Sequence, residues 1–274
     1  VAYGANALSS NTTHNFNTAI EYNSLSAQNS DGYNTAVGSE SMQTTTTGAY
    51  NVAMGRLALG ANTTGSEQTA VGYEALKDNT TGLENQAFGF RALTNNLTGN
   101  SNTALGKDAM LNTTTGNENV AIGKDVMLFN TTGYENVAIS REAMRVNTTG
   151  GQNTAVGKNA LLLNTTGVNN VAVGNNSLDA NSTGNNNVGL GTNALSANTT
   201  AEANTAVGVN ALKYNTTADN NTAVGLDALR DNSTGAQGTA VGHLALTANT
   251  TGASNTAIGA SALAANTTNS NNTA

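Results

Sequence analysis

The residues of this chain that could carry chemistry are mainly asparagines, and most of them recur in one short motif. Asn-Thr-Thr or a close variant repeats along the chain, as in "ALLLNTTGVNNVAVG" (residues 160–174). Asn-x-Ser/Thr is the acceptor sequence for N-linked sugars. The motif also suits a turn, because asparagine tolerates positive φ and its side chain bonds to nearby backbone groups. Two hypotheses therefore stand at these turns, a sugar-bearing asparagine and a purely structural one.

The candidate sugar acceptors share the sequence Asn-x-Thr. They are Asn11, Asn62, Asn79, Asn96, Asn112, Asn130, Asn147, Asn164, Asn181, Asn198, Asn215, Asn232, Asn249 and Asn266. At Asn112 the motif slips by one residue, which an acceptor tolerates and a strict ladder of stacked asparagines does not predict. Against sugar, the threonine persists where the asparagine is lost, at Thr47 and Thr115, so it has its own role in the turn.

Two histidines and one glycine-rich stretch are the other residues that could suggest catalysis. His14 and His243 lie near opposite ends of the chain, so a repeating architecture keeps them apart. The stretch "GLGTNA" (189–194) loosely matches a dinucleotide fingerprint, but no helix is expected after it to receive a pyrophosphate. An enzyme needs converging titratable groups. We expect no catalytic site, no metal site and no cofactor.

A local charge pattern recurs every 17 residues. It consists of Lys107, Lys124, Arg141 and Lys158, with Asp108, Asp125 and Glu142 beside the first three. Like charges stacked one repeat apart repel each other, and the adjacent opposite column offsets this. We interpret the pattern as a solvated stripe of mixed charge, with recognition of a partner as the alternative.

The composition limits the function classes. Of 274 residues, 38% are hydrophobic, 4% aromatic and 10% charged, where soluble domains average about 25% charged. A net charge of −7 argues against nucleic acid as a partner. No stretch approaches the roughly 18 apolar residues of a membrane helix, so no membrane insertion is expected. Cysteine, proline and tryptophan are absent, so disulfides and thiolate chemistry are excluded.

An internal repeat organises the whole chain. Units that begin like Thr69–Asn85, "TAVGYEALKDNTTGLEN", follow one another every 17 residues from residue 1 without insertion. Sixteen units fill the chain, and Thr273-Ala274 opens another, so residues 1–274 form a single repeat array. The chain has no initiating Met and no recognisable capping unit, and we expect it to be a window of a longer fibre.

The repeat predicts an all-β fold, a parallel β-solenoid of sixteen 17-residue coils with two short strands per coil. A 17-residue unit is too short for a helix pair. Strands are expected at positions 1–3 and 7–9 of each coil, with equivalent strands stacked about 4.8 Å apart. The larger apolar residues at positions 3 and 8 are expected inside. The small residues at positions 2 and 7 are then expected outside, against a neighbouring chain.

A second asparagine, at position 17, precedes the first strand of nearly every coil. It lacks the acceptor sequence, so we predict an internal asparagine ladder of the kind that stabilises stacked strands. The rungs include Asn85, Asn102, Asn119, Asn136, Asn153, Asn170, Asn187 and Asn204.

The unit "NTAVGKNAL" (Asn153–Leu161) resembles the head repeats of trimeric autotransporter adhesins. With its "NTTG" it also resembles repeat arrays of tail-fibre-like and bacterial surface proteins. The resemblance covers all sixteen units. It implies a β-roll in a secreted or surface fibre, often a homotrimer.

These observations together predict a structural, self-associating fibre located outside the cell or on a cell or virion surface. Its expected partners are copies of itself, as a trimer or an end-to-end filament, and glycans. An adhesin or receptor-binding fibre head is the alternative. Ice binding by ordered threonine columns is a minor alternative, which thermal hysteresis would reveal.

Overall fold

A computed structural model of the chain describes residues 1–11, 15–29 and 32–274. The described residues form sixteen short β-strands and no helix. Two compact units, residues 1–135 and 136–274, each contain eight of these strands. Within a unit, consecutive strands pair in parallel with equivalent positions in register, as Ala70 with Ala87 and Ala206 with Ala223. The predicted fold class, a parallel β-solenoid, is confirmed.

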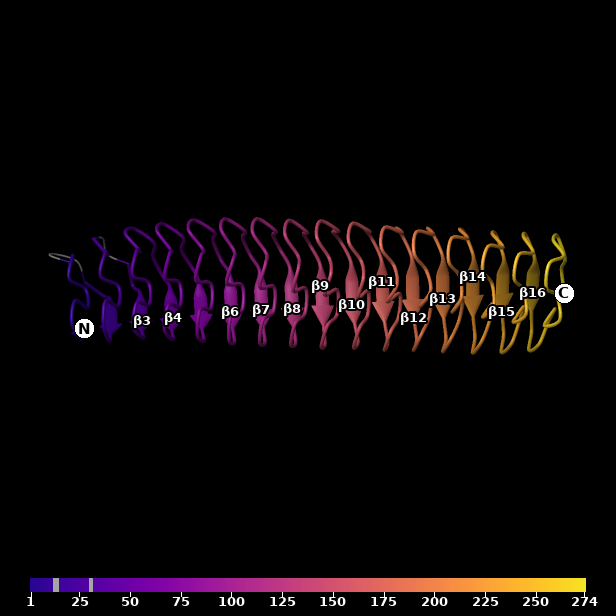
Figure 1. Cartoon of the computed structure of the whole chain (residues 1–274), viewed down its shortest axis with the longest axis horizontal. Helices are drawn as coiled ribbons and strands as arrows, with labels where there is room; N and C mark the ends of the chain where they lie inside the picture. The colour runs from indigo at the N-terminus through magenta and orange to yellow at the C-terminus, as the bar shows by residue number, and fades with distance from the viewer. Residues whose placement is uncertain (12–14, 30–31) are drawn as a thin grey trace. The chain divides into compact units, whose positions relative to one another are not determined.

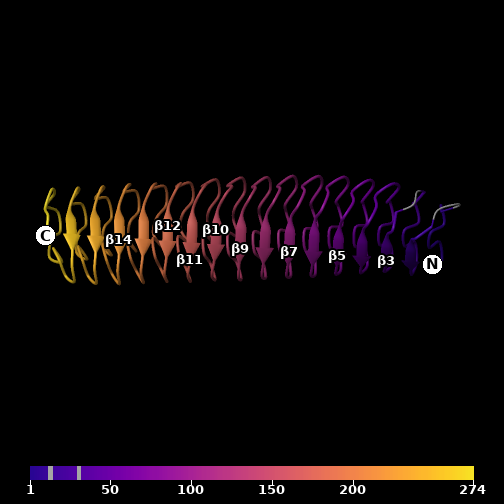
Figure 2. The same cartoon turned by 180° about the vertical axis from the view of Figure 1, so that it is seen from behind.

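The strands occupy positions 1–3 of the coils. In the first unit they are β1 (Ala2–Tyr3), β2 (Thr18–Ile20), β3 (Thr35–Val37), β4 (Val52–Met54), β5 (Thr69–Val71), β6 (Gln86–Phe88), β7 (Thr103–Leu105) and β8 (Val120–Ile122). In the second unit they are β9 (Val137–Ile139), β10 (Thr154–Val156), β11 (Val171–Val173), β12 (Val188–Leu190), β13 (Thr205–Val207), β14 (Thr222–Val224), β15 (Thr239–Val241) and β16 (Thr256–Ile258). In both views of the molecule the strands of each unit lie side by side in chain order (Figures 1 and 2).

Each described coil has one strand, so the predicted second strand at positions 7–9 is wrong. The backbone there turns repeatedly through positive φ, as at Glu74 (56°) and Leu76 (51°), which extended strands do not allow. The segment still bonds to the next coil. The Leu76 N–H donates to the Ala92 carbonyl (3.0 Å), and the Asp78 N–H donates to the Thr94 carbonyl (2.9 Å). Coils are therefore linked on this side without a regular β-ladder.

Glycine at position 4 ends the strand because two constraints meet there. Gly72 has φ of +137°, a conformation that residues with a Cβ rarely adopt. A Cβ on Gly72 would lie 2.3 Å from the carbonyl oxygen of Gly89 in the next coil. Only Glu21 (φ 87°) and Ser140 (φ 111°) occupy this position without being glycine.

The interior of the coil holds the small residues, which reverses part of the predicted orientation. Ala70, Ala75 and Leu76, at positions 2, 7 and 8, are fully buried, whereas position 3 faces outward. The interior is narrow. A Cβ on Gly189, which replaces alanine at position 2, would lie 2.6 Å from Ser177 Oγ and 3.4 Å from Leu178 Cγ. Alanine is therefore small because positions 2, 7 and 8 crowd one another, and not because a neighbouring chain approaches it.

Candidate functional site

The asparagines at position 17 form a ladder inside the coil. The backbone N–H of Asn102 donates to Asn85 Oδ1 (3.0 Å), and Asn102 Nδ2 donates to the carbonyl of Gly116 (2.8 Å) in the next coil. The same pattern joins Asn170 to Asn153 (2.9 Å). Each side chain thus bonds to the coils on both sides.

The predicted rungs of this ladder are present and buried. Asn85, Asn102, Asn119, Asn136, Asn153, Asn170, Asn187 and Asn204 are each at most 1% exposed. Their amide nitrogens donate to position-14 carbonyls, as Asn119 to Gly133 (2.8 Å) and Asn136 to Gly150 (2.9 Å), except that Asn204 donates to the carbonyl of Glu202 (3.2 Å). At Gly238 the side chain is missing: its N–H donates to Asn221 Oδ1 (2.7 Å), but it offers no oxygen to the next coil.

The asparagines at position 11 form a second buried ladder, in keeping with the structural alternative that the sequence left open at these turns. Asn164 Nδ2 donates both to Asn147 Oδ1 (2.9 Å) in the preceding coil and to the carbonyl of Gly167 (3.1 Å) in its own coil. Asn181 repeats this toward Asn164 (3.0 Å). Both amide protons of these side chains are therefore used inside the coil.

A sugar on such an amide is incompatible with this fold, because the nitrogen is enclosed and already donates two hydrogen bonds. The structure therefore argues against sugar on the buried acceptors. These are Asn62, Asn79, Asn96, Asn130, Asn147, Asn164, Asn181, Asn198, Asn215, Asn232 and Asn249, each at most 1% exposed. Asn11, Asn112 and Asn266 are half-buried. Asn266 Nδ2 donates to Asn249 Oδ1 (3.2 Å) and to the Asn269 carbonyl (3.0 Å).

The middle residue of the Asn-x-Thr motif also bonds between coils. The hydroxyl of Thr165 donates to the carbonyl of Ser182 (2.9 Å), and that of Ser182 donates to the carbonyl of Thr199 (3.0 Å). The preference for Thr or Ser at position 12 is thus structural. A sugar acceptor does not require a hydroxyl at the middle residue, so it leaves the repeated Thr or Ser after the asparagine unexplained. That repetition was the sequence signal for a structural role of the motif.

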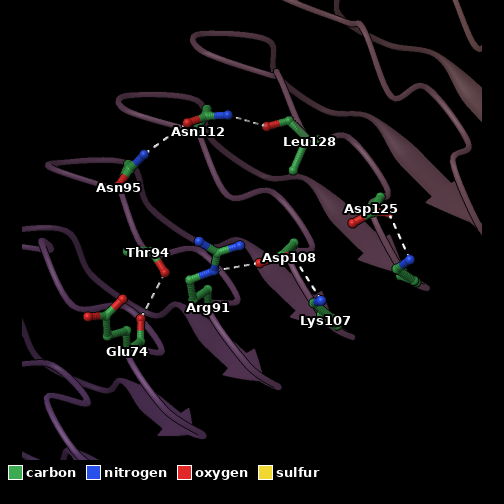
Figure 3. A network of polar contacts seen from close by, with 10 residues as sticks. Glu74, Arg91, Thr94, Asn95, Lys107, Asp108, Asn112, Asp125 and Leu128 are labelled. Carbon is green, nitrogen blue, oxygen red and sulfur yellow. Dashed lines mark hydrogen bonds and ion pairs between the residues drawn. The ribbon is translucent and has the colours of Figure 1, made fainter.

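The slip at Asn112 breaks the position-11 ladder. Thr113 takes the buried position, and neither its hydroxyl nor Asn96 Oδ1 has a hydrogen-bond partner. Asn112 instead lies one position earlier on the outer turn, where it accepts from Asn95 Nδ2 (2.9 Å) and donates to the Leu128 carbonyl (3.0 Å) (Figure 3). The slip is therefore a local defect of the ladder.

The outer face of the sheet carries an apolar column. Position 3 is apolar in every coil and faces outward, with Leu105 47% and Val173 39% exposed. Position 1, threonine or valine in nearly every coil, shares this face because alternate strand residues point the same way. Parallel sheets are normally covered on both faces. The inner face is covered by the coil, so the outer face is the candidate interaction surface, which we call the sheet face.

The predicted charge stripe lies beside the sheet face. Lys107 and Lys124 approach Asp108 and Asp125 at 3.9 and 3.4 Å, and Arg141 approaches Glu142 at 3.4 Å. Lys158 is followed by an asparagine instead of an acid.

Asp108 is the most enclosed acid of this stripe and also accepts from Arg91 Nε at 2.8 Å (Figure 3). The hydrogen bond to Asp108 raises the pKa of the Arg91 guanidinium. The side chains of Lys107 and Lys124 remain more than half exposed.

Other candidates for chemistry do not form a site. His243 is exposed at position 5, and His14 lies outside the described residues. "GLGTNA" (189–194) runs along β12 into a turn, and no helix follows it. The described part of the chain has no pocket and no cluster of metal-ligating side chains. No helix that could span a membrane occurs in it.

Comparison with known proteins finds no protein-family model that matches the chain and no curated protein with significant similarity.

Proposed function

We propose that this protein is a structural component of an extracellular fibre, a stiff solenoid shaft that associates with copies of itself. The observation that carries the proposal is the apolar sheet face, which each unit repeats coil after coil. The proposed location, outside the cell or on a cell or virion surface, rests on the resemblance of the repeat to surface fibres.

The sheet face supports self-association because its position-3 side chains are apolar, as in a protein core, although they face outward. Exposed apolar patches of this extent mark interaction sites in soluble proteins. A partner that covers the column along its length needs the same repeat spacing, and a second copy has it. Val71 and Ile122 are only partly exposed, whereas Met54 and Leu105 project by almost half of their surface.

The interior supports a mechanical role. In each unit, successive coils are joined at several points of their circumference. The links are backbone hydrogen bonds, two asparagine ladders and a hydroxyl ladder. Bending or stretching a unit disturbs several of these at once, since identical positions repeat from coil to coil. Stiffness is therefore expected without disulfides or metals.

Sedimentation velocity and electron microscopy of the full chain test the proposal. The parent protein should associate as its concentration rises and form elongated assemblies. Replacing two outward residues, Met54→Asp with Leu105→Asp, should abolish association. The matched control is Leu97→Asp with Leu163→Asp, which are 44% and 46% exposed at positions 12 and 10. A parent protein that stays monomeric at every concentration contradicts the proposal.

An adhesive fibre head is the second candidate, favoured by an exposed aromatic stack. Phe16, Tyr33 and Tyr50 stack at 4.9 and 5.3 Å between ring centroids and are 68%, 49% and 61% exposed. Replacing all three with serine should lower attachment to a host surface if this candidate holds. Unchanged attachment would remove it.

A further inference from the structure

We propose that Asn220 is an attachment site for an N-linked sugar, and that Asn271 is a second one in the same setting. Both residues belong to acceptor sequences that are separate from the repeated Asn-Thr-Thr turns. This inference rests on the proposed extracellular location, because acceptor sequences carry sugar on the surface of secreted chains. The sugar would project from the surface of the second unit (residues 136–274).

The acceptor sequence of Asn220 crosses the start of a strand. It reads "NNT" (220–222), so the acceptor is at position 16, the middle residue is a position-17 rung and the threonine opens β14. The same sequence recurs three coils later at 271–273. Sugars on Asn220 and Asn271 would stand roughly 14 Å apart along the stack, at about 4.8 Å per coil. They would therefore avoid the crowding that a sugar on every coil would cause.

The fold turns both ends of this acceptor sequence outward. Asn220 is exposed and Thr222 is half-buried on the sheet face, whereas Asn221 between them is fully buried. Asn221 is held as a rung, since its N–H donates to Asn204 Oδ1 (2.9 Å). Within the described part of the chain, neither the side-chain amide of Asn220 nor the hydroxyl of Thr222 has a hydrogen-bond partner. A transferase can therefore reach both groups without opening the coil.

Two kinds of acceptor sequence in the second unit lack this arrangement. In "NTT" (164–166) the asparagine is fully buried and its amide is bonded within the position-11 ladder. In "NNS" (175–177) the asparagine is exposed, but Ser177 is fully buried and its hydroxyl donates to the Gly189 carbonyl (2.9 Å). An acceptor sequence requires Ser or Thr as its third residue. Asn220 is distinguished from both kinds because its acceptor amide and its hydroxyl are accessible together.

The second unit contains a natural counterpart of Asn220 that differs in the third residue. Asn186 is also exposed at position 16 and is followed by a fully buried rung, Asn187. Its strand opens with Val188 instead of threonine, so Asn186 does not lie in an acceptor sequence. Val188 and Thr222 are both half-buried at position 1. Exchanging valine and threonine at this position should therefore leave the fold intact.

The modification joins the amide nitrogen of Asn220 to C1 of a sugar that is activated by phosphate at that carbon. The Nδ2–C1 bond forms as the bond between C1 and the phosphate oxygen breaks. The phosphate group leaves with the bonding electrons, and the amide gives up one proton. The protein is the acceptor in this reaction, and a separate transferase catalyses it.

Transfer of glucose to the folded full chain tests the site. The chain is incubated with a soluble asparagine glycosyltransferase and UDP-glucose, and the modified residues are mapped by mass spectrometry. We expect glucose on Asn220 and Asn271, and none on Asn164 or Asn175.

Synthetic peptides provide the control for the transferase. The enzyme is chosen to modify peptides of residues 160–170, 171–179 and 216–226, which carry three of these acceptor sequences without the fold. Any difference between the three sites in the full chain then reflects the structure and not the preference of the enzyme.

Exchanging the residue at position 1 tests the role of the hydroxyl. Thr222→Val should remove the sugar from Asn220, and Val188→Thr should create a new acceptor at Asn186. Circular dichroism and the denaturant midpoint should match those of the parent in both variants, because both residue types occur at this position.

The outcomes separate this inference from the proposed function. Glucose on Asn220 of the folded chain, with the loss and the gain in the two variants, supports it. An unmodified Asn220, or transfer to Asn164 of the folded chain, overturns it, and an unmodified Asn271 removes the second site. Self-association is measured separately by sedimentation. A parent protein that stays monomeric while Asn220 is modified contradicts the proposed shaft and leaves the sugar site standing.

Discussion

The inside of the coil and its sheet face are equally regular in sequence but for different physical reasons. Inside, alanine, leucine and asparagine recur because the narrow interior accepts only those shapes and because each amide bonds to the neighbouring coils. On the sheet face, apolar residues recur although the described part of the chain leaves them partly or largely exposed. Regularity inside therefore reflects folding, whereas we propose that regularity outside reflects association. Substitutions on the two sides should separate these effects.

The largest loss of stability is expected from truncating a buried leucine. Leu161→Ala removes a fully buried side chain at position 8 and should cost about 2–5 kcal/mol. Denaturant unfolding followed by circular dichroism measures this. Leu163→Ala, at a side chain that is 46% exposed, is the control and should change stability by less than about 0.5 kcal/mol. Equal effects would contradict the assigned interior.

A smaller loss is expected from one rung of the position-11 ladder. Asn164→Ala removes the donor to Asn147 Oδ1 and to the Gly167 carbonyl, which stay buried. The expected cost is about 1–3 kcal/mol, measured in the same unfolding experiment. A variant as stable as the parent, or a mass spectrum with sugar on Asn164, would show that this side chain is not an internal rung.

A repair of the broken ladder should stabilise the protein. Thr113→Asn places an amide beside the unpartnered Asn96 Oδ1 and removes the unpartnered hydroxyl. We expect a gain of about 0.5–1.5 kcal/mol, visible as a higher denaturant midpoint. Thr115→Asn, on the exposed turn, should give no gain. A destabilised Thr113→Asn variant would mean that the slip has a role of its own.

The smallest expected effect concerns one surface ion pair. Arg230 donates to both carboxylate oxygens of Asp231 at 2.8 and 2.9 Å, which lowers the pKa of Asp231. The ion pair therefore stabilises the folded protein above the ordinary aspartate pKa, and this stabilisation is lost as the pH falls through the lowered pKa of Asp231. Asp231→Asn should cost less than about 1 kcal/mol near neutral pH. The difference from the parent should vanish in strong acid, and thermal melts across this pH range measure it.

The coil length, the parallel stacking and the position-17 ladder could be predicted because each follows from identical residues at a fixed spacing. Stacking in register brings each asparagine next to its equivalent, whatever the detailed path of the chain. Asn102 and Asn170 therefore lie where the repeat places them.

The orientation of the strand could not be predicted in the same way. In Thr-Ala-Val the side chains alternate between the two faces of the strand, but the residue types do not show which face lies inside the coil. Placing Val71 inside follows the usual rule that larger apolar residues are buried. That rule fails here because Leu76, Ala75 and two asparagines already fill the narrow interior beside Ala70.

The sequence left the role of the position-11 asparagine open because two motifs coincide there. A buried asparagine followed by a bonding hydroxyl, as in Asn164-Thr165, and then by another threonine is also an acceptor sequence for sugar. The strand at positions 7–9 was wrongly predicted for a different reason. Positive φ at a leucine such as Leu76 is rare, and the residue type does not predict it.

Cysteine accessibility tests most directly the claim that the sheet face is the surface of association. Ala155→Cys and Val156→Cys, at adjacent positions of β10, are labelled with a maleimide in dilute monomer and in the assembled protein. We predict that Val156→Cys reacts rapidly in the monomer and becomes protected on assembly, whereas Ala155→Cys is protected in both. Rapid labelling of Ala155→Cys in the monomer, or equal labelling of Val156→Cys in both states, would contradict the account.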